Sequence, residues 1–126
     1  MAKVEIRTPE APTPVAAFSQ GVRKGNVLQV AGQVAFDADG KITADTVAEQ
    51  TRQALRNVNA VLAAGGASMD DVIMLRVYLT DTSHFAEMNQ AYGEFVKEPY
   101  PARTTVYVGL PAGLLVEIDA LAVVGD

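Results

Sequence analysis

The sequence predicts an α+β fold: one sheet with two helices packed on one of its faces. Two segments carry apolar residues at helical spacing, and the other apolar segments are short and rich in β-branched residues. Prolines and glycines separate these segments, and no repeat or linker divides the chain. A chain of 126 residues has the usual size of one domain, so we expect a single domain over residues 1–126.

The first helix is predicted over residues 45–64, where apolar side chains recur every three or four residues. Thr43 or Asp45 could cap its start, and Gly65 and Gly66 are expected to end it. The second helix is predicted over residues 83–96. Two prolines, Pro99 and Pro101, prevent that helix from continuing.

The strands are predicted from β-rich segments between turn residues. The proline-rich segment 8–14 can be neither strand nor helix interior and is expected to cross the surface as an extended lead-in. A nearly continuous apolar segment in the middle of the chain indicates a central strand. The predicted strands are residues 18–23, 26–32, 72–80, 103–108 and 115–123.

Charge and composition exclude several classes of protein. The net charge is −5, and the largest basic cluster is Arg23-Lys24, which argues against nucleic-acid binding as the main role. Without cysteine there is no disulfide or thiol nucleophile, and the single His84 excludes a multi-histidine metal site. No segment reaches the roughly 18 apolar residues of a membrane helix, and the first residues lack a signal-peptide pattern. We therefore expect a cytoplasmic protein without a membrane partner.

The last two predicted strands carry the strongest chemical signal. Side chains alternate between the two faces of a strand, so an apolar set should meet the helices and a polar set should face away. Pairing these strands antiparallel with their apolar sets together places Arg103 opposite Asp119 and Thr105 opposite Glu117. Arg103 and Glu117 would then be diagonal neighbours on the uncovered face. The expected polar set is Arg103, Thr105, Tyr107, Leu115, Glu117, Asp119 and Leu121, and the expected apolar set is Val106, Val108, Val116, Ile118, Ala120 and Ala122.

Two interpretations of this polar set remain open: an ordinary ion pair on a solvated sheet face, or a ligand site. The same face carries several large apolar residues, and no further segment of the chain is available to cover it. Self-association would cover it and would bury Arg103 and Glu117 between subunits. Buried charges of this kind must be paired or must serve a ligand.

Asn89 and Gly32 are further candidates. Asn89 interrupts the apolar side of the second helix, where its amide must find partners; it could bind a loop backbone or belong to a site. Gly32 interrupts a strand, which indicates either a bulge or a place where a ligand approaches the backbone.

The C-terminal part resembles the RidA (YjgF-type) family of reactive-intermediate deaminases. The resemblance rests on residues 101–111, PARTTVYVGLP, continued by VEIDALAV at 116–123. It extends over nearly the whole chain and takes in Gly21, the segment 31–33 and the helical segments 53–58 and 85–89.

This resemblance implies a chorismate-mutase-like fold assembled as a homotrimer with active sites between subunits. It implies that Arg103 holds a substrate carboxylate, that Glu117 positions or activates water, and that Asn89 and the backbone near Gly32 line the pocket. The implied reaction converts 2-imino or enamine acids into 2-keto acids and ammonia without a cofactor or metal. The implied partner is therefore a small 2-imino or 2-keto carboxylic acid.

Three positions depart from the usual family pattern. Phe18 stands where a tyrosine is usual, Ala31 where a serine is usual, and Thr105 where a cysteine is usual. The first two changes remove hydroxyl groups, whereas Thr105 keeps a small polar group that could help to orient the substrate. Two alternative functions remain. The lost hydroxyls favour a non-catalytic trimer that binds small carboxylates or acts as a holdase, whereas the retained Arg103 and Glu117 oppose it. The other is an endoribonuclease, a label that some members of the resembled family carry, which the acidic charge and the single histidine disfavour.

Overall fold

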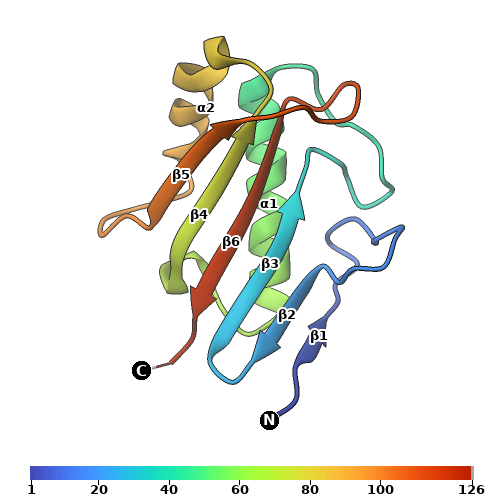
Figure 1. Ribbon diagram of the computed structural model, residues 1–126, viewed down its shortest axis with the longest axis vertical. Helices are drawn as coiled ribbons and strands as arrows, with labels where there is room; N and C mark the ends of the chain where they lie inside the picture. The colour runs from blue at the N-terminus through green and yellow to red at the C-terminus, as the bar shows by residue number, and fades with distance from the viewer. Residues whose placement is uncertain (126) are drawn as a thin grey trace.

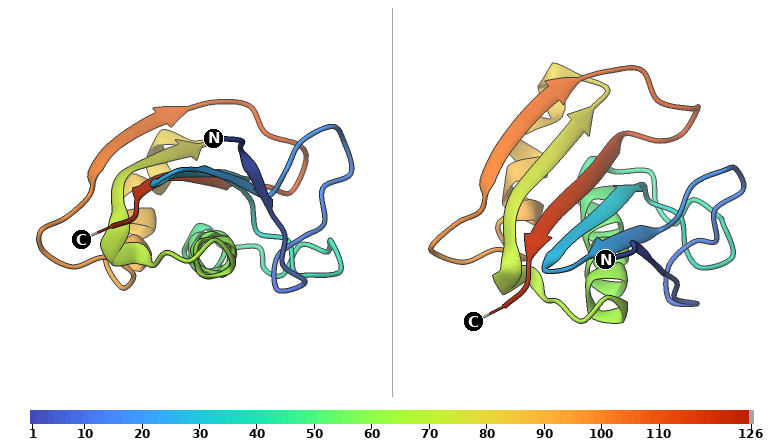
Figure 2. Two further views of the ribbon diagram at one scale, coloured as in Figure 1. Left: turned by 90° about the horizontal axis from the view of Figure 1, so that it is seen from below. Right: turned by 60° about the horizontal axis from the view of Figure 1, so that its bottom comes forward.

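The computed structural model describes residues 1–125. A six-stranded mixed sheet has the order β1-β2-β3-β6-β4-β5, and both helices lie on the same side of it (Figures 1 and 2). The predicted fold class, one sheet with two helices on one face, is confirmed. The strands are β1 (Val4–Ile6), β2 (Gly21–Lys24), β3 (Val27–Gln33), β4 (Val72–Leu79), β5 (Ala102–Tyr107) and β6 (Val116–Val123), and the helices are α1 (Val47–Ala64) and α2 (Phe85–Tyr92).

The core lies between the sheet and the two helices. Helix α1 contributes its periodic apolar side, including Leu55, Val58 and Leu62, all without solvent exposure. Strands β4 and β6 contribute alternate residues such as Val77 and Ile118, also fully buried. The opposite face of the sheet has no helix over it in the described part of the chain, as the view along the sheet shows (Figure 2, left). We call this uncovered surface the open face.

Both helices begin or end differently from the prediction. Thr46, and not Thr43 or Asp45, caps α1, because its side chain accepts a hydrogen bond from the Glu49 amide. The predicted end of α1 at Gly65 is confirmed. Helix α2 is shorter than 83–96: a 3-10 turn (Thr82–His84) precedes it, and the chain leaves the helix after Tyr92. No helix of residues 1–125 combines the length and apolar character required to span a bilayer.

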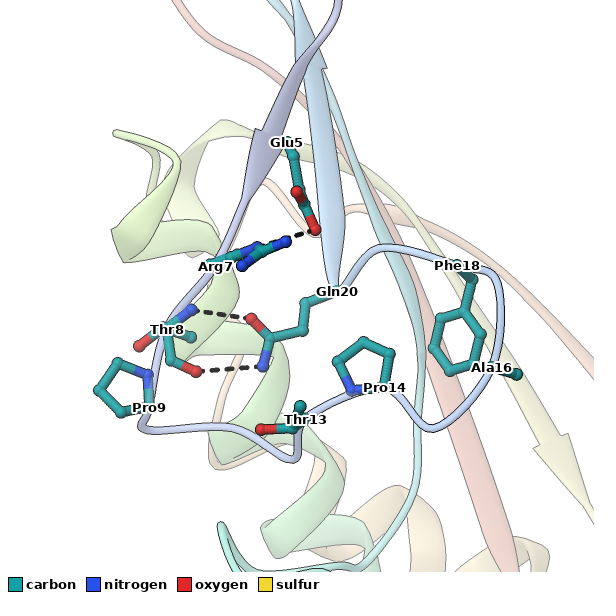
Figure 3. Close-up of a pocket in the computed structure, with 9 residues that line it drawn as sticks. All are labelled: Glu5, Arg7, Thr8, Pro9, Thr13, Pro14, Ala16, Phe18 and Gln20. Carbon is teal, nitrogen blue, oxygen red and sulfur yellow. Dashed lines mark hydrogen bonds and ion pairs between the residues drawn. The ribbon is translucent and has the colours of Figure 1, made fainter.

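The N-terminal segment is more ordered than its composition predicted. Val4–Ile6 forms an edge strand that pairs with β2, and β2 begins at Gly21, so Phe18 belongs to a loop and not to the predicted strand. Buried Gln20 holds the lead-in: its amide oxygen accepts from the Thr8 N–H at 2.8 Å, and its Nε2 donates to the Thr8 carbonyl at 3.1 Å (Figure 3). The same Nε2 also lies 2.9 Å from the Pro12 carbonyl. One glutamine thereby replaces the backbone ladder that the prolines cannot form.

The predicted pairing of the last two strands is wrong. β5 is the sheet edge and pairs only with β4, in parallel, while β6 lies antiparallel between β3 and β4. β4, α2 and β5 form a strand–helix–strand unit, and such units join parallel strands. In the observed register Leu75 is the partner of Arg103, and Arg76 is the partner of Asp119.

The predicted faces are right for β6 and wrong for β5. Ile118 points into the core, so its neighbours Glu117 and Asp119 point to the open face, as expected. Arg103, however, contacts side chains of α2 and therefore points to the helix-covered side, whereas Val106 is 39% exposed. The predicted Arg103–Glu117 neighbourhood within one chain does not exist, because the two side chains leave the sheet on opposite faces.

Candidate active site

Helix α2 holds the guanidinium of Arg103 in place. Nη1 of Arg103 donates to Oδ1 of Asn89 at 2.7 Å. The guanidinium carbon also lies 4.8 Å from the ring centre of Tyr92 and 5.7 Å from that of Phe85. A cation held over aromatic faces and bonded to a neutral amide keeps its charge uncompensated. The arrangement orients the cation and leaves N–H groups available for an anion.

No carboxylate competes for Arg103. Among residues 1–125, the ion pairs involve other arginines and a lysine, and Asp119, the predicted partner of Arg103, is paired with Arg76 instead. Beside Arg103, a cleft of about 540 Å³ is lined by Asn89, Tyr92, Tyr100 and Pro101. We call it the Arg103 cleft. The bond to Asn89 also decides between the two readings of that residue: it belongs to the surroundings of the arginine, and no loop backbone is its recorded partner.

Thr105 lies two residues after Arg103 on the same side of β5. Its Oγ1 is buried and has no hydrogen-bond partner among the described residues. A buried hydroxyl normally bonds to something, so the hydrogen-bonding capacity of this oxygen is unused. The side chain that replaces the family's usual cysteine therefore retains a hydrogen-bonding capacity next to the arginine.

Glu117 and Gly32 form a second group of candidate residues on the open face. The β3–β6 pairing shifts register between Val30 and Gln33, so the predicted bulge at Gly32 is confirmed. A Cβ atom at position 32 would lie 2.2 Å from Oε2 of Glu117. A side chain at position 32 would therefore displace the Glu117 carboxylate from its present place.

The half-buried Glu117 carboxylate has an unusual environment. Burial raises its pKa, and the negative charge of Asp119 raises the pKa further. A carboxylate that holds its charge less readily is better matched to proton transfer near neutral pH. This property fits the predicted role of Glu117 in activating water.

Phe18 and Gly32 line a common cleft. Its volume is about 320 Å³, and Val34 and Phe36 complete its apolar wall. Phe18 is 54% exposed and also borders a second hollow between the lead-in and β1, drawn in Figure 3. Ala31, where the family's serine is usual, directly precedes Gly32 at the bulge. We call the cleft that contains Phe18 and Gly32 the Phe18 cleft.

The predicted site residues therefore fall into two groups. Arg103, Asn89 and Thr105 lie at the β5–α2 edge, and Phe18, Gly32 and Glu117 lie around the β3–β6 bulge. Among residues 1–125 no side-chain hydrogen bond or ion pair joins the two groups, and β4 separates their strands. Each group fits part of the predicted chemistry: the first presents a cation with free N–H groups, and the second presents a half-buried carboxylate.

Comparisons with known proteins identify the family of this chain. The family model described as endoribonuclease L-PSP matches residues 8–124. A protein named 2-iminobutanoate/2-iminopropanoate deaminase, from Dermatophagoides farinae, is 34% identical over 94% of this chain and 94% of its own. A RutC family protein of Pyrococcus horikoshii is 44% identical over 95% of this chain and 97% of its own. This chain belongs to the RidA (YjgF-type) family.

Solved RidA-family structures have the same fold. The crystal structure of RidA from an Antarctic Psychrobacter bacterium superposes with a TM-score of 0.91 at 36% identity, over 96% of this chain and 99% of that one. The Escherichia coli protein TdcF, solved with bound serine, gives a TM-score of 0.90 at 37% identity, over 97% and 99%. The family assignment made from the sequence is confirmed.

Four residues beside the candidate site are not among those that the sequence predicts for it. Phe85 and Tyr92 lie within the predicted second helix, where their spacing is the same whether they pack on a core or on a guanidinium. Arg76 and Tyr78 were included in a central strand without a role. Arg76 Nε lies 2.8 Å from Asp119 Oδ1, and the Tyr78 hydroxyl donates to Asp119 Oδ2 at 2.7 Å. Only the strand order brings these residues beside Asp119.

Proposed function

We propose that this RidA-family chain hydrolyses reactive 2-imino and enamine acids to 2-keto acids and ammonia, at sites formed between subunits of a homotrimer. The observation that carries the proposal is the state of Arg103. Its guanidinium is oriented by Asn89 and Tyr92, borders an open cleft and has no carboxylate partner among residues 1–125. The planar guanidinium donates two parallel N–H bonds to a carboxylate, a geometry that lysine cannot reproduce.

The assembly follows from the placement of the two groups of site residues. Arg103 and Glu117 leave the sheet on opposite faces, so a joint site requires the Arg103 cleft of one subunit to meet the Phe18 cleft of another. The open face also exposes apolar side chains, with Val27 at 48%, Val106 at 39% and Val123 at 43%. A sheet face of this kind is stabilised by contact with another surface. Association of subunits would satisfy both requirements.

The proposed reaction uses few groups. Arg103 binds the substrate carboxylate, and Glu117 accepts a proton from the water that attacks the imine carbon. Addition of water converts the C=N bond into a C–N bond, and Glu117 passes the water proton to nitrogen, which gives a carbinolamine. Glu117 then takes the proton of the new hydroxyl group and passes it to the amino group, so the C–N bond breaks and releases ammonia as the carbonyl forms. General acid–base assistance of this type typically contributes about 10²–10⁴-fold. The Thr105 hydroxyl and the backbone at Gly32 orient the substrate.

The relatives support this substrate class. The mite relative is named for 2-iminobutanoate and 2-iminopropanoate, and the TdcF structure contains serine, an α-amino acid with the same carboxylate. The missing hydroxyls at Phe18 and Ala31 favour the alternative of a trimer that binds a carboxylate without turnover. An assay must therefore separate binding from hydrolysis.

The test generates the imine in place with an amino-acid oxidase and follows its lifetime together with ammonia release. We expect the wild-type protein to shorten the lifetime and the Arg103→Ala variant to be inactive with its folded assembly intact. Arg56→Ala, which removes an exposed arginine on α1, serves as the matched control and should remain active. Equal turnover by Arg103→Ala would exclude the proposed site, and saturable 2-keto acid binding without turnover by the wild type would establish the binding alternative.

A further inference from the structure

Strand β6 presents two carboxylates on the open face with very different surroundings. Both oxygens of Asp119 are bonded, one to Arg76 and the other to Tyr78. Glu117, two residues earlier, has no hydrogen bond or ion pair with any side chain among residues 1–125. The two carboxylates differ because the side chains of β4 reach Asp119 and leave Glu117 free.

The two carboxylates are close enough to interact electrically. Alternate residues of a strand are about 7 Å apart, a distance at which half-buried charges still affect each other appreciably. Burial raises the pKa of Glu117, and the charge on Asp119 raises it further. The hydrogen bond to Asp119 also raises the pKa of Tyr78, so this phenol stays a neutral donor at physiological pH. The positive charge of Arg76 is thus the element that compensates Asp119.

Few other charges face this pair. On β4, the strand beside β6, the titratable or charged side chains are Arg76 and Tyr78. On the other side, β3 contributes no titratable side chain over Val27–Gln33. In the proposed assembly, Arg103 of a neighbouring subunit would also approach Glu117. That charge is present in all the variants considered below. Differences between the variants in the pKa of Glu117 therefore come from the side chains of β4 and β6.

We propose that Arg76 is a positioning residue that sets the proton affinity of Glu117 through Asp119, by keeping this neighbouring carboxylate ion-paired on β4. Removing the Arg76 charge leaves the charge of Asp119 uncompensated, so Glu117 holds its proton more tightly. A smaller fraction of the protein then has a deprotonated Glu117 that can act as a base at neutral pH. Neutralising Asp119 has the opposite effect. The catalytic meaning of this coupling rests on the proposed function, whereas the coupling itself does not.

The experiment compares Arg76→Gln, Arg76→Lys and Asp119→Asn with the wild type. The pKa of Glu117 is measured by ¹³C NMR of its side-chain carboxyl, with the signal assigned from Glu117→Gln, and the pH profile of kcat/KM is recorded in parallel. We expect Arg76→Gln to raise the pKa by about half a pH unit or more and Asp119→Asn to lower it by a similar amount. The acid limb of the kcat/KM profile should move to higher pH in Arg76→Gln and to lower pH in Asp119→Asn.

Two controls distinguish the charge at position 76 from the loss of a positive charge elsewhere on the protein. Arg76→Lys restores the charge and should return the pKa of Glu117 close to the wild-type value. Lys97→Gln removes one positive charge from an exposed side chain whose Nζ lies 3.5 Å from Asp70, and should leave Glu117 unchanged. The proposal is overturned if Arg76→Gln lowers the pKa of Glu117, or raises it by no more than Lys97→Gln does. If Arg76→Gln does not fold, the Asp119→Asn shift decides: a lower pKa supports the coupling, and an unchanged one overturns it.

The two proposals fail separately. If the wild type does not hydrolyse imines, the NMR titration still measures the coupling of Arg76 to Glu117, so only the proposed function fails. If the wild type is active and its acid limb follows Glu117 but does not respond to Arg76→Gln, the proposed function stands and this inference fails.

Discussion

The Arg103 guanidinium donates to Asn89 at 2.7 Å, and this bond joins strand β5 to helix α2 at the candidate site. An amide is suited to this position because it accepts a hydrogen bond without neutralising the cation. The pair therefore combines orientation with an available positive charge.

Replacing Asn89 by alanine should weaken substrate binding. Hydrogen bonds to charged groups contribute about 1.5–3 kcal/mol, so we expect kcat/KM to fall by roughly tenfold or more, mainly through a higher KM. Asn89→Asp should be more harmful, because its carboxylate would pair with Arg103 and exclude the substrate carboxylate. Steady-state kinetics test this, with the partly buried Asn59→Ala on α1 as the control. Unchanged kinetics in Asn89→Asp would show that Arg103 does not bind the substrate.

Adding a single methyl group at Gly32 should impair the site. The new Cβ would lie 2.2 Å from Glu117 Oε2, so the carboxylate must move. We expect Gly32→Ala to lose at least about tenfold in kcat, because a displaced base is no longer in reach of the attacking water. Gly109→Ala is the matched control, since a Cβ there has no atom within 4 Å. Full activity of a folded Gly32→Ala protein would contradict the assigned position of Glu117.

Glu117 should reduce stability at neutral pH. Folding raises its pKa, so the folded state binds a proton more tightly than the unfolded state does. The contribution of Glu117 to the free energy of unfolding is therefore greatest in acid and decreases as pH rises through the folded-state pKa. We expect Glu117→Gln to unfold at higher denaturant concentration than the wild type at pH 8, and the difference to disappear below about pH 4.

Denaturant titrations of Glu117→Gln and the wild type at both pH values test this expectation. A Glu117→Gln variant that is less stable than the wild type at pH 8 would indicate that the charge is compensated in the folded protein.

The open face should carry the subunit contacts. Val106 is 39% exposed there, on the edge strand β5. Val106→Glu would place a charge in the proposed interface, where burying it is strongly unfavourable, and should reduce the mass measured by light scattering toward that of one chain. Ala63→Glu adds the same charge on an exposed part of α1 and should leave the mass unchanged. If both variants keep the wild-type mass, the contacts lie elsewhere.

The sequence by itself determined the local elements and the chemical groups. Helical spacing predicted α1 and α2, the bulge at Gly32 was visible as a glycine within a strand, and Arg103, Asn89 and Glu117 were identified as the candidate residues. These signals are encoded in contiguous residues, whose periodicity and turn preferences do not depend on the rest of the chain. The family resemblance was also carried by a contiguous stretch, residues 101–123.

Only the tertiary structure decided which strands are neighbours. It placed β4 between β5 and β6, turned Arg103 toward α2, and brought Arg76 beside Asp119. Strand order depends on contacts between residues far apart in the chain, and a one-residue difference in register reverses the face of every side chain. The predicted alternation of side chains along β5 is correct. The local sequence does not determine which of the two alternating sets faces the helices. Because Arg103 belongs to the set that faces the helices, it is separated from Glu117 on the open face. The proposed assembly depends on this separation.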